Sequence, residues 1–271
     1  MDADTAEKLK EGQRAVWSSG DWPKFAPVIQ AVADGVVEGL GVEAGQDFLD
    51  VATGSGNAAI AAARRGARVS GLDLVPELIE AARARAAGEG LEIEFVVGNA
   101  EELPFADGSF DRVSSVFGVM FAPRHQQGAD ELARVTRPGG SIAVAAWTPE
   151  GMNGQMFKAI GEHMPPPPEG FQPPVLWGTE EHVRELFSAP GLEVSCEKRM
   201  AEFDWDSVEE WMDHCERNLG PVVTAKAALE PQGKWEAVRA DLLRLDEQFN
   251  EADDGTMRTR AEYLLTTVTR A

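Results

Sequence analysis

Short hydrophobic runs alternate with helical repeats of apolar residues between residues 47 and 147. The runs predict strands at 47–52, 68–73, 93–97, 110–117 and 141–147. Between them, apolar residues are spaced for one face of a helix over residues 56–65, 76–88 and 125–136. Strands joined by helical crossovers form a parallel sheet with helices on both faces. The pattern therefore predicts a doubly wound α/β domain.

After Trp147 the pattern is less regular. It predicts helices near 153–163, 179–188, 206–219 and 232–250, a strand near 192–204 and a last strand over 263–269. The expected fold is a Rossmann-like, doubly wound, mostly parallel seven-stranded sheet with helical N-terminal and C-terminal cap additions. Its parts would be an N-terminal helical cap (1–45), an α/β core (46–204, with a loop and helix at 150–190), a helical cap insertion (205–255) and the last sheet strand (256–271).

Composition narrows the range of partners. The chain has 271 residues, 43% of them hydrophobic, so it can bury a sizeable core. Its 46 acidic and 25 basic residues give a net charge of -21, which opposes binding to nucleic acid phosphates or anionic lipid. We therefore expect a small-molecule substrate, no nucleic-acid partner and no membrane partner. The sequence leaves a homodimer open.

Cysteine usage and the start of the chain indicate a location. Cys196 and Cys215 match neither a disulfide framework nor a paired zinc motif, and we expect no metal. Residues 1–8 are polar and acidic, unlike a signal peptide, and no apolar run approaches the roughly 20 residues that span a bilayer. The expected location is the cytoplasm.

The turn that follows the first predicted strand is the strongest candidate for a ligand site. That strand carries Asp50, and Gly54 and Gly56 open the next helix, where backbone N–H groups can approach a ligand. Gly54 to Ala59 also matches G-x-G-x-x-A, the fingerprint of a nicotinamide or flavin dinucleotide, and Asp73 ends the second strand. Asp50 would repel a diphosphate but attract an ammonium or sulfonium. Charge therefore favours a cationic cofactor.

Several motifs occur in a shared order from residue 46 to residue 147. They are Leu49–Gly56, Gly71–Asp73, Gly98–Phe105, Phe110–Asp111, Phe117–Met120 and Leu132–Gly140. Together they resemble the class I S-adenosylmethionine-dependent methyltransferases, and the later stretches at 147–151 and 176–182 resemble bacterial small-molecule members. The resemblance implies S-adenosyl-L-methionine as the cofactor.

The resemblance also implies roles for residues. Asp50 and the backbone near Ala52 would hold the methionine moiety, Asp73 the ribose hydroxyls and Leu74 the adenine. Asn99 stands where many relatives have Asp, and its amide oxygen can accept from the adenine amino group as well. The full expected cofactor-binding set is Trp22, Asp50, Ala52, Thr53, Gly54, Gly56, Asp73, Leu74, Asn99, Ala100, Glu101, Phe117, Gly118 and Met120.

Methyl transfer requires alignment of an acceptor and, for some acceptors, a general base. Among four histidines, His125 is the candidate, because it follows the Phe117–Pro123 loop. A largely apolar cap would form the acceptor site, which suits a hydrophobic or aromatic metabolite with an O-, N- or C-acceptor. The expected cap residues are Trp17, Trp22, Phe25, Met152, Met156, Phe157, Trp177, Trp211 and Met212.

Two alternative functions remain. One is an NAD(P)-dependent oxidoreductase, and the other is a non-methylating S-adenosylmethionine-binding protein, cyclase-like or regulatory.

Overall fold

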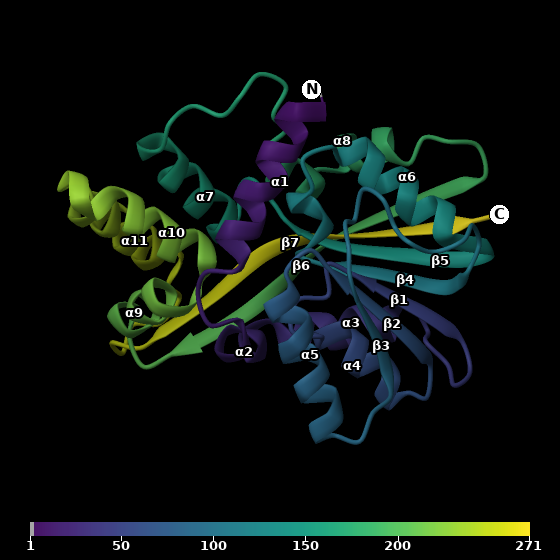
Figure 1. Ribbon diagram of the computed structural model, residues 1–271. Coiled ribbons are helices and arrows are strands. Elements are labelled where there is room, and N and C mark those ends of the chain that lie inside the picture. Colours follow the sequence, from purple (N-terminus) through teal and green to yellow (C-terminus); the bar gives the residue numbers. More distant parts are fainter. Residues whose placement is uncertain (1–2) are drawn as a thin grey trace.

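A seven-stranded sheet forms the centre of the protein (Figure 1). The computed structural model describes residues 3–271. The strand order is β3-β2-β1-β4-β5-β7-β6; β1 to β5 run parallel, and β7 runs antiparallel to β5 and β6. The predicted mostly parallel, seven-stranded fold is confirmed. The strands are β1 (Asp47–Val51), β2 (Arg68–Asp73), β3 (Ile93–Val97), β4 (Phe110–Val116), β5 (Thr136–Trp147), β6 (Leu192–Trp205) and β7 (Met257–Arg270).

The central strand β1 shows why the first hydrophobic run is continuous. Phe48, Leu49 and Val51 are all 0% exposed, since β1 lies between β2 and β4 with helices on both faces. From β1 the chain proceeds outward to β2 and β3, then returns to β4 on the other side. Such a reversal leaves a crevice beyond the carboxyl ends of the strands, where doubly wound sheets bind their ligands.

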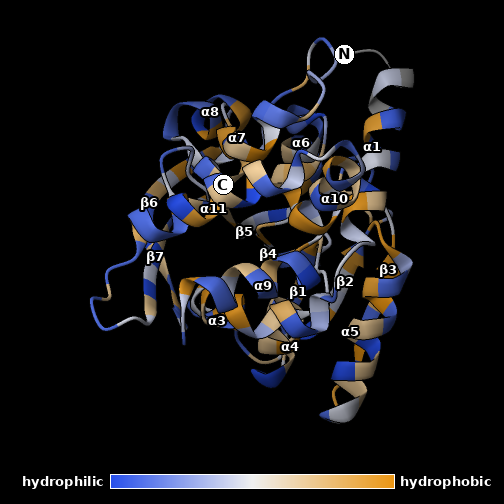
Figure 2. Cartoon of the chain, turned by 90° about the vertical axis from the view of Figure 1, so that its left-hand side faces the viewer, coloured by the Kyte–Doolittle hydropathy of each residue, from blue (hydrophilic) through white to orange (hydrophobic). Residues whose placement is uncertain are grey.

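Helices cover both faces of the sheet. α3, α4 and α5 lie on one face, and α6 and α8 lie on the other (Figure 1). Figure 2 shows hydrophobic and hydrophilic residues on the same helices, as expected where one side packs on a sheet and the other meets solvent. The bounds are α3 (Gln30–Gly39), α4 (Asn57–Arg64), α5 (Pro76–Gly88), α6 (His125–Val135) and α8 (Glu180–Leu186).

The remaining helices gather around one end of the sheet. β6 and β7 pair over 14 residues each, from Leu192 opposite Arg270 to Trp205 opposite Met257, and their far ends extend to α9 (Figure 1). α11 packs on α7 and α9, and α1 packs on α10. The first two residues of the expected N-terminal cap lie outside the described part. These helices are α1 (Ala3–Trp17), α2 (Trp22–Phe25), α7 (Met152–His163), α9 (Val208–Asn218), α10 (Gly220–Leu229) and α11 (Trp235–Phe249).

Two elements differ from the sequence prediction. No element was predicted between residues 219 and 232, but α10 occupies most of this stretch, with Pro221 in its first turn, where a missing N–H breaks no helical hydrogen bond. β5 begins at Thr136 rather than Ser141, and the register of its ladder with β4 shifts there. Pro138, Gly139 and Gly140, which we expected to end the preceding helix and to lie before the strand, therefore lie within an irregular strand. None of the helices in residues 3–271 is long and apolar enough to cross a membrane.

Candidate functional site

The turn between β1 and α4 borders open space. Gly54 and Gly56 have φ values of 56° and 89°, which glycine adopts at little cost and other residues rarely do. A Cβ added at Gly54 would meet nothing within 4 Å. The predicted glycine turn thus exists, and its first glycine faces a cavity.

Asp50, on β1, is fixed by three hydrogen bonds. Its Oδ2 accepts from Thr53 Oγ1 at 2.6 Å and from the Ala59 N–H at 3.2 Å, and its Oδ1 accepts from Ser114 Oγ at 2.7 Å. The residue is 2% exposed, and this burial raises the pKa of the carboxyl to about 6 against the lowering effect of its hydrogen bonds. The carboxylate is therefore held rigidly, but its charge is poorly solvated.

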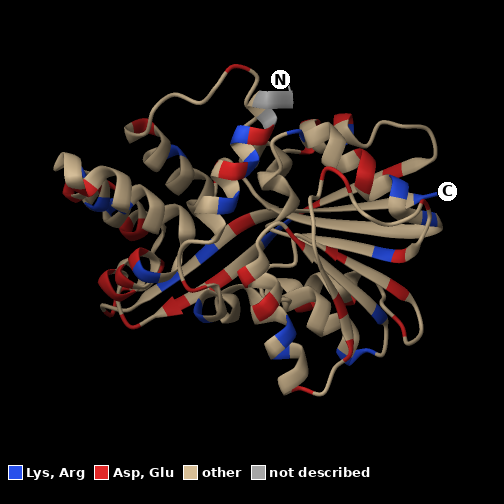
Figure 3. Cartoon of the chain, in the orientation of Figure 1, with Lys and Arg blue, Asp and Glu red and all other residues tan. Residues whose placement is uncertain are grey.

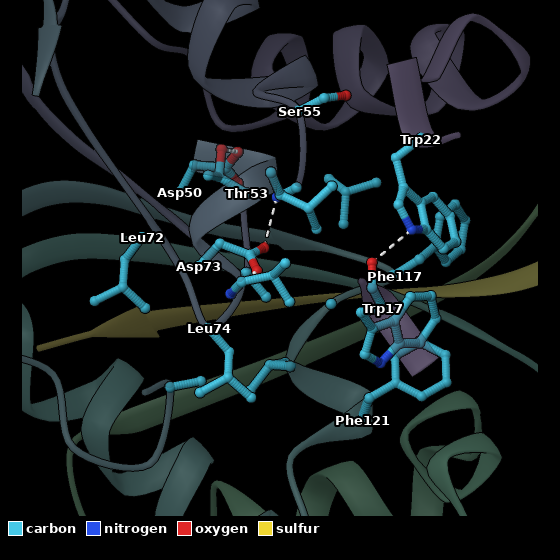
Figure 4. A pocket seen from close by; sticks show the side chains of 18 of the residues that line it. Trp17, Trp22, Asp50, Thr53, Ser55, Leu72, Asp73, Leu74, Phe117 and Phe121 are labelled. Carbon is cyan, nitrogen blue, oxygen red and sulfur yellow. Dashed lines mark hydrogen bonds between the residues drawn. The ribbon is translucent and has the colours of Figure 1, made fainter. Parts of the chain in front are cut away.

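Asp73, the last residue of β2, faces the same turn. Its Oδ2 accepts from the Gly54 N–H at 2.8 Å, and its Oδ1 accepts from the Val75 N–H at 3.0 Å (Figure 4). Burial raises its pKa to about 6 as well, and its charge adds to the raised pKa of Asp50. In residues 3–271 no Lys or Arg side chain is hydrogen-bonded to either carboxylate. Two buried acids without a cation favour a positively charged ligand.

Both acids line one cavity, together with aromatic side chains of the N-terminal segment (Figure 4). It contains about 1090 Å³ of empty space, a volume that includes open solvent at its mouth. Most of the expected cofactor-binding residues line it: Trp22, Asp50, Ala52, Thr53, Gly54, Asp73, Leu74, Asn99, Ala100, Phe117 and Gly118.

Three expected cofactor contacts lie behind the cavity wall. Met120 is fully buried in the core, and a Cβ at Gly56 would lie 3.3 Å from the Cβ of Ala82. Glu101 is 0% exposed and holds Arg124: its Oε2 accepts from Nε at 2.9 Å and Nη2 at 2.8 Å, and its Oε1 accepts from the backbone N–H at 2.7 Å. Glu101 thus fixes the start of α6 instead of reaching into the cavity.

Asn99 lines the cavity but already uses its side-chain oxygen. Its Oδ1 accepts from the Glu101 N–H at 3.0 Å. A carbonyl oxygen has two lone pairs, so one acceptor position remains for a ligand.

His125 does not belong to the cavity, contrary to the expectation that it faces the cofactor. Its Nδ1 lies 2.9 Å from Nε2 of His182, and its ring centroid is 5.8 Å from that of Trp177. Burial, followed by the charge on His182, lowers the pKa of His125 to about 3, so the ring is neutral near pH 7. In the described part of the chain, no histidine lines the cavity. The geometry therefore gives His125 no role as a general base.

The loop after β4 holds an unusual backbone conformation against the turn after β1. Among the described residues, Phe117 and Ala52 are the non-glycine residues with positive φ, at 51° and 53°. The Phe117 ring stacks on Trp147, with centroids 3.6 Å apart and planes at 5°. A Cβ at Gly118 would lie 2.6 Å from the Cβ of Ala52, so only glycine fits between the loops. The sequence indicated Phe117 and Gly118 but not the stacking partner.

The aromatic wall is smaller than the sequence predicted. Trp17, Trp22 and Phe25 line the cavity, and Phe121, which was not predicted, completes the wall. The Trp17 ring centroid lies 5.0 Å from that of Trp22 and 4.4 Å from that of Phe121. The other expected cap residues do not line the cavity: Met152, Met156, Phe157, Trp177, Trp211 and Met212.

Two polar residues of α1 were also missed. Lys10 and Gln13 line the cavity beside Trp17. The three positions are spaced i, i+3 and i+7, which places them on one face of the helix. That spacing is visible in the sequence, but nothing in it indicates where this face points.

Comparisons with known proteins agree with this geometry. Residues 49–144 match the family model of a methyltransferase domain. An uncharacterized protein of Mycobacterium tuberculosis is 38% identical over 264 residues, which cover 96% of this chain and 95% of that protein. A demethylmenaquinone methyltransferase of Deinococcus radiodurans is 38% identical over 122 residues, 44% of this chain and 51% of that protein. The solved structure of the YcgJ protein of Bacillus subtilis shares the fold, with a TM-score of 0.61 and 18% identity over 89% of this chain and 99% of that chain.

The matched span begins in β1 and ends in β5, so it contains both acids, the glycine turn and the loop after β4. These parts line the cavity together with residues of the N-terminal segment. The chain belongs to the class I S-adenosylmethionine-dependent methyltransferase family.

Proposed function

We propose that this protein transfers a methyl group from S-adenosylmethionine to a small hydrophobic or aromatic acceptor. The observation that carries the proposal is the pair of buried acids, Asp50 and Asp73, on neighbouring strands of one cavity without a cation beside them. S-adenosylmethionine carries a sulfonium and an ammonium group and, when bound, supplies an activated methyl group. Both positive charges suit the part of the cavity that holds these two acids.

The chain offers a partner for each portion of the cofactor. Asp73 would accept from the ribose hydroxyls, and Leu74 and Ala100 would flank the adenine. Asp50 and the backbone of the turn at Ala52 and Gly54 would hold the methionine portion, where the missing side chain of Gly54 leaves room. These assignments follow the family resemblance, and the lining of the cavity supports them.

The nicotinamide alternative fits this turn poorly. A dinucleotide places its diphosphate on free N–H groups at the start of the helix. Here the Gly54 N–H donates to Asp73, the Ala59 N–H donates to Asp50, and the Gly56 N–H donates to the Thr53 carbonyl oxygen at 2.9 Å. A diphosphate would have to displace carboxylates that also repel it.

The acceptor would occupy the part of the cavity that the additions to the core enclose. We propose residues 46–204 as the cofactor-binding core and residues 1–45 and 205–255 as the cap. Trp17 and Phe121, with ring centroids 4.4 Å apart, form an apolar wall beside the loop after β4. Flat apolar molecules bury much surface against such rings.

Isothermal titration calorimetry with S-adenosylmethionine, S-adenosylhomocysteine and NADH tests the cofactor. We expect the first two to bind and NADH not to bind; the reverse would refute the proposal. Mass spectrometry of candidate acceptors incubated with the protein and S-adenosylmethionine then tests for a gained methyl group. Cofactor binding with an altered but unmethylated product would favour the cyclase-like alternative.

A further inference from the structure

We propose that the acceptor is a phenol or an enol that binds and reacts as its oxygen anion, and that Lys10 and Gln13 select it. This inference rests on the proposed methyl transfer and adds the chemical class of the acceptor.

The charges in the cavity are separated. Asp50 and Asp73 belong to the turn and the strand ends, whereas Lys10, on α1, is the cation among the described residues that line the cavity. The Lys10 side chain is 16% exposed, and its ammonium lies 2.5 Å from the carboxylate of Glu7, which is 63% exposed. An acceptor in the cavity would therefore meet a mostly buried ammonium whose described partner remains in solvent.

Lys10 shares its surroundings with two other basic side chains, those of Arg14 and Arg124. The pKa of Glu7 is lowered first by Lys10 and, more weakly, by the charges of Arg14 and Arg124. Figure 3 shows both basic and acidic residues along α1. Lys10 thus gives this end of the cavity a positive charge that Glu7 partly offsets, whereas Asp50 and Asp73 give the other end negative charge.

The polar groups on this face of α1 leave donors toward the cavity. Gln13 Oε1 accepts from Trp17 Nε1 at 2.8 Å, so the acceptor atom of the amide is already engaged. In residues 3–271 the Gln13 NH₂ group has no hydrogen-bond partner. The other indole N–H, that of Trp22, donates to the Trp17 carbonyl oxygen at 2.8 Å. Two residues that line the cavity therefore carry an ammonium and an amide NH₂, and both groups recognise an oxygen that carries negative charge.

The cavity also lacks a base for a protonated acceptor. No histidine lines it in the described part of the chain, and Asp50 and Asp73 are engaged by donors at the cofactor end. An ammonium acceptor would have to lose a proton first, and Lys10 would repel it. An oxygen anion needs no base: its electron pair forms the new bond to the methyl carbon, and the methyl donor keeps the pair of the bond that breaks. The ring walls of Trp17 and Phe121 suit the flat group that stabilises such an anion.

A chromophoric phenol tests this inference without turnover. The probe is 4-nitrophenol, whose phenolate absorbs visible light, titrated against the protein saturated with S-adenosylhomocysteine. In the wild-type protein we expect the phenolate to bind and the pKa of the bound phenol to fall below its value in water. Lys10→Met should weaken phenolate binding about tenfold, the effect expected when a hydrogen bond to a charged group is lost, and should abolish the fall in pKa.

Matched controls distinguish an effect of the lost Lys10 charge from an effect of the substitution on folding. Lys10→Arg should keep most of the affinity, and Glu7→Gln, which removes the competing carboxylate, should leave it unchanged or increase it. 4-Nitrobenzylamine, an amine with the same ring, should bind at least about tenfold more weakly. The inference is overturned if the loaded wild-type protein does not bind the phenolate, if Lys10→Met binds it equally well, or if the amine binds better. Failure to bind S-adenosylhomocysteine would instead refute the proposed function.

Discussion

Replacing Asp73 by Asn tests whether the cavity carries an unsolvated negative charge. Burial raises the pKa of Asp73 from 3.8 to about 6. A carboxyl whose pKa is raised by folding holds its proton more tightly in the folded state than in the unfolded state. The folded state therefore loses stability as the pH rises from 3.8 to about 6, and the loss is complete above that range. At about 1.4 kcal/mol per pH unit, this gap corresponds to about 3 kcal/mol.

Asparagine cannot ionise, so the variant lacks this pH-dependent penalty. The free energy of unfolding of the wild type minus that of Asp73→Asn should fall by about 3 kcal/mol between about pH 3.5 and about pH 7. Asn retains an acceptor for only one of the N–H groups of Gly54 and Val75, but this loss does not vary with pH. Removing the Asp73 charge also lowers the pKa of Asp50 in the variant. This change makes the difference in the free energy of unfolding fall further as the pH rises.

Urea unfolding of the unliganded proteins across this pH range measures the difference, and the subtraction cancels the contributions of distant acids. A difference that stays constant with pH would refute the burial argument. At pH 7 the same variant should bind S-adenosylhomocysteine about 10- to 100-fold more weakly, because a hydrogen bond to a charged group contributes about 1.5–3 kcal/mol. An unchanged dissociation constant would remove Asp73 from the cofactor site.

Three further substitutions test the loops around the cavity. Gly118→Ala places a Cβ 2.6 Å from that of Ala52, so calorimetry should show at least about tenfold weaker S-adenosylhomocysteine binding, and wild-type affinity would refute the close approach. Trp147→Ala removes the stack under Phe117 and should lower the free energy of unfolding by about 3–5 kcal/mol in urea, whereas Trp147→Phe should retain most of it. His125→Ala should lower the melting temperature but leave kcat per folded molecule unchanged, and a large fall in kcat would restore its role as a base.

The fold was predictable from local signals in its first half. β1 and β3 contain short apolar runs, β2 and β4 carry apolar residues among polar ones, and glycines or prolines mark the ends of α4 and α5. The errors fall where these signals are ambiguous. Pro221 is compatible with both a loop and the first turn of a helix, and a Pro-Gly-Gly sequence can end a helix or lie in an irregular strand.

The site was predictable where function depends on strand ends, since topology fixes where those ends meet. Asp50 and Asp73 meet for this reason. Residues on helices were less predictable, because a sequence shows the faces of a helix but not which neighbour each face meets. Lys10 reaches the cavity because α1 packs on α10, where a Cβ at Gly220 would collide with the Val16 carbonyl oxygen. A close approach of two backbones leaves no periodic pattern in the sequence, so it could not be predicted.

The long ladder between β6 and β7 determines how the cavity can exchange its contents. The ladder is continuous from Leu192 to Trp205, so the two strands that flank the helices of residues 205–255 are held to each other along their whole length. Trp17, in contrast, ends α1, which residues 18–21 join to α2 and which packs on α10. Entry of ligands into the cavity and their release should therefore depend on displacement of α1. A crosslink between α1 and α10 would trap whatever the cavity holds.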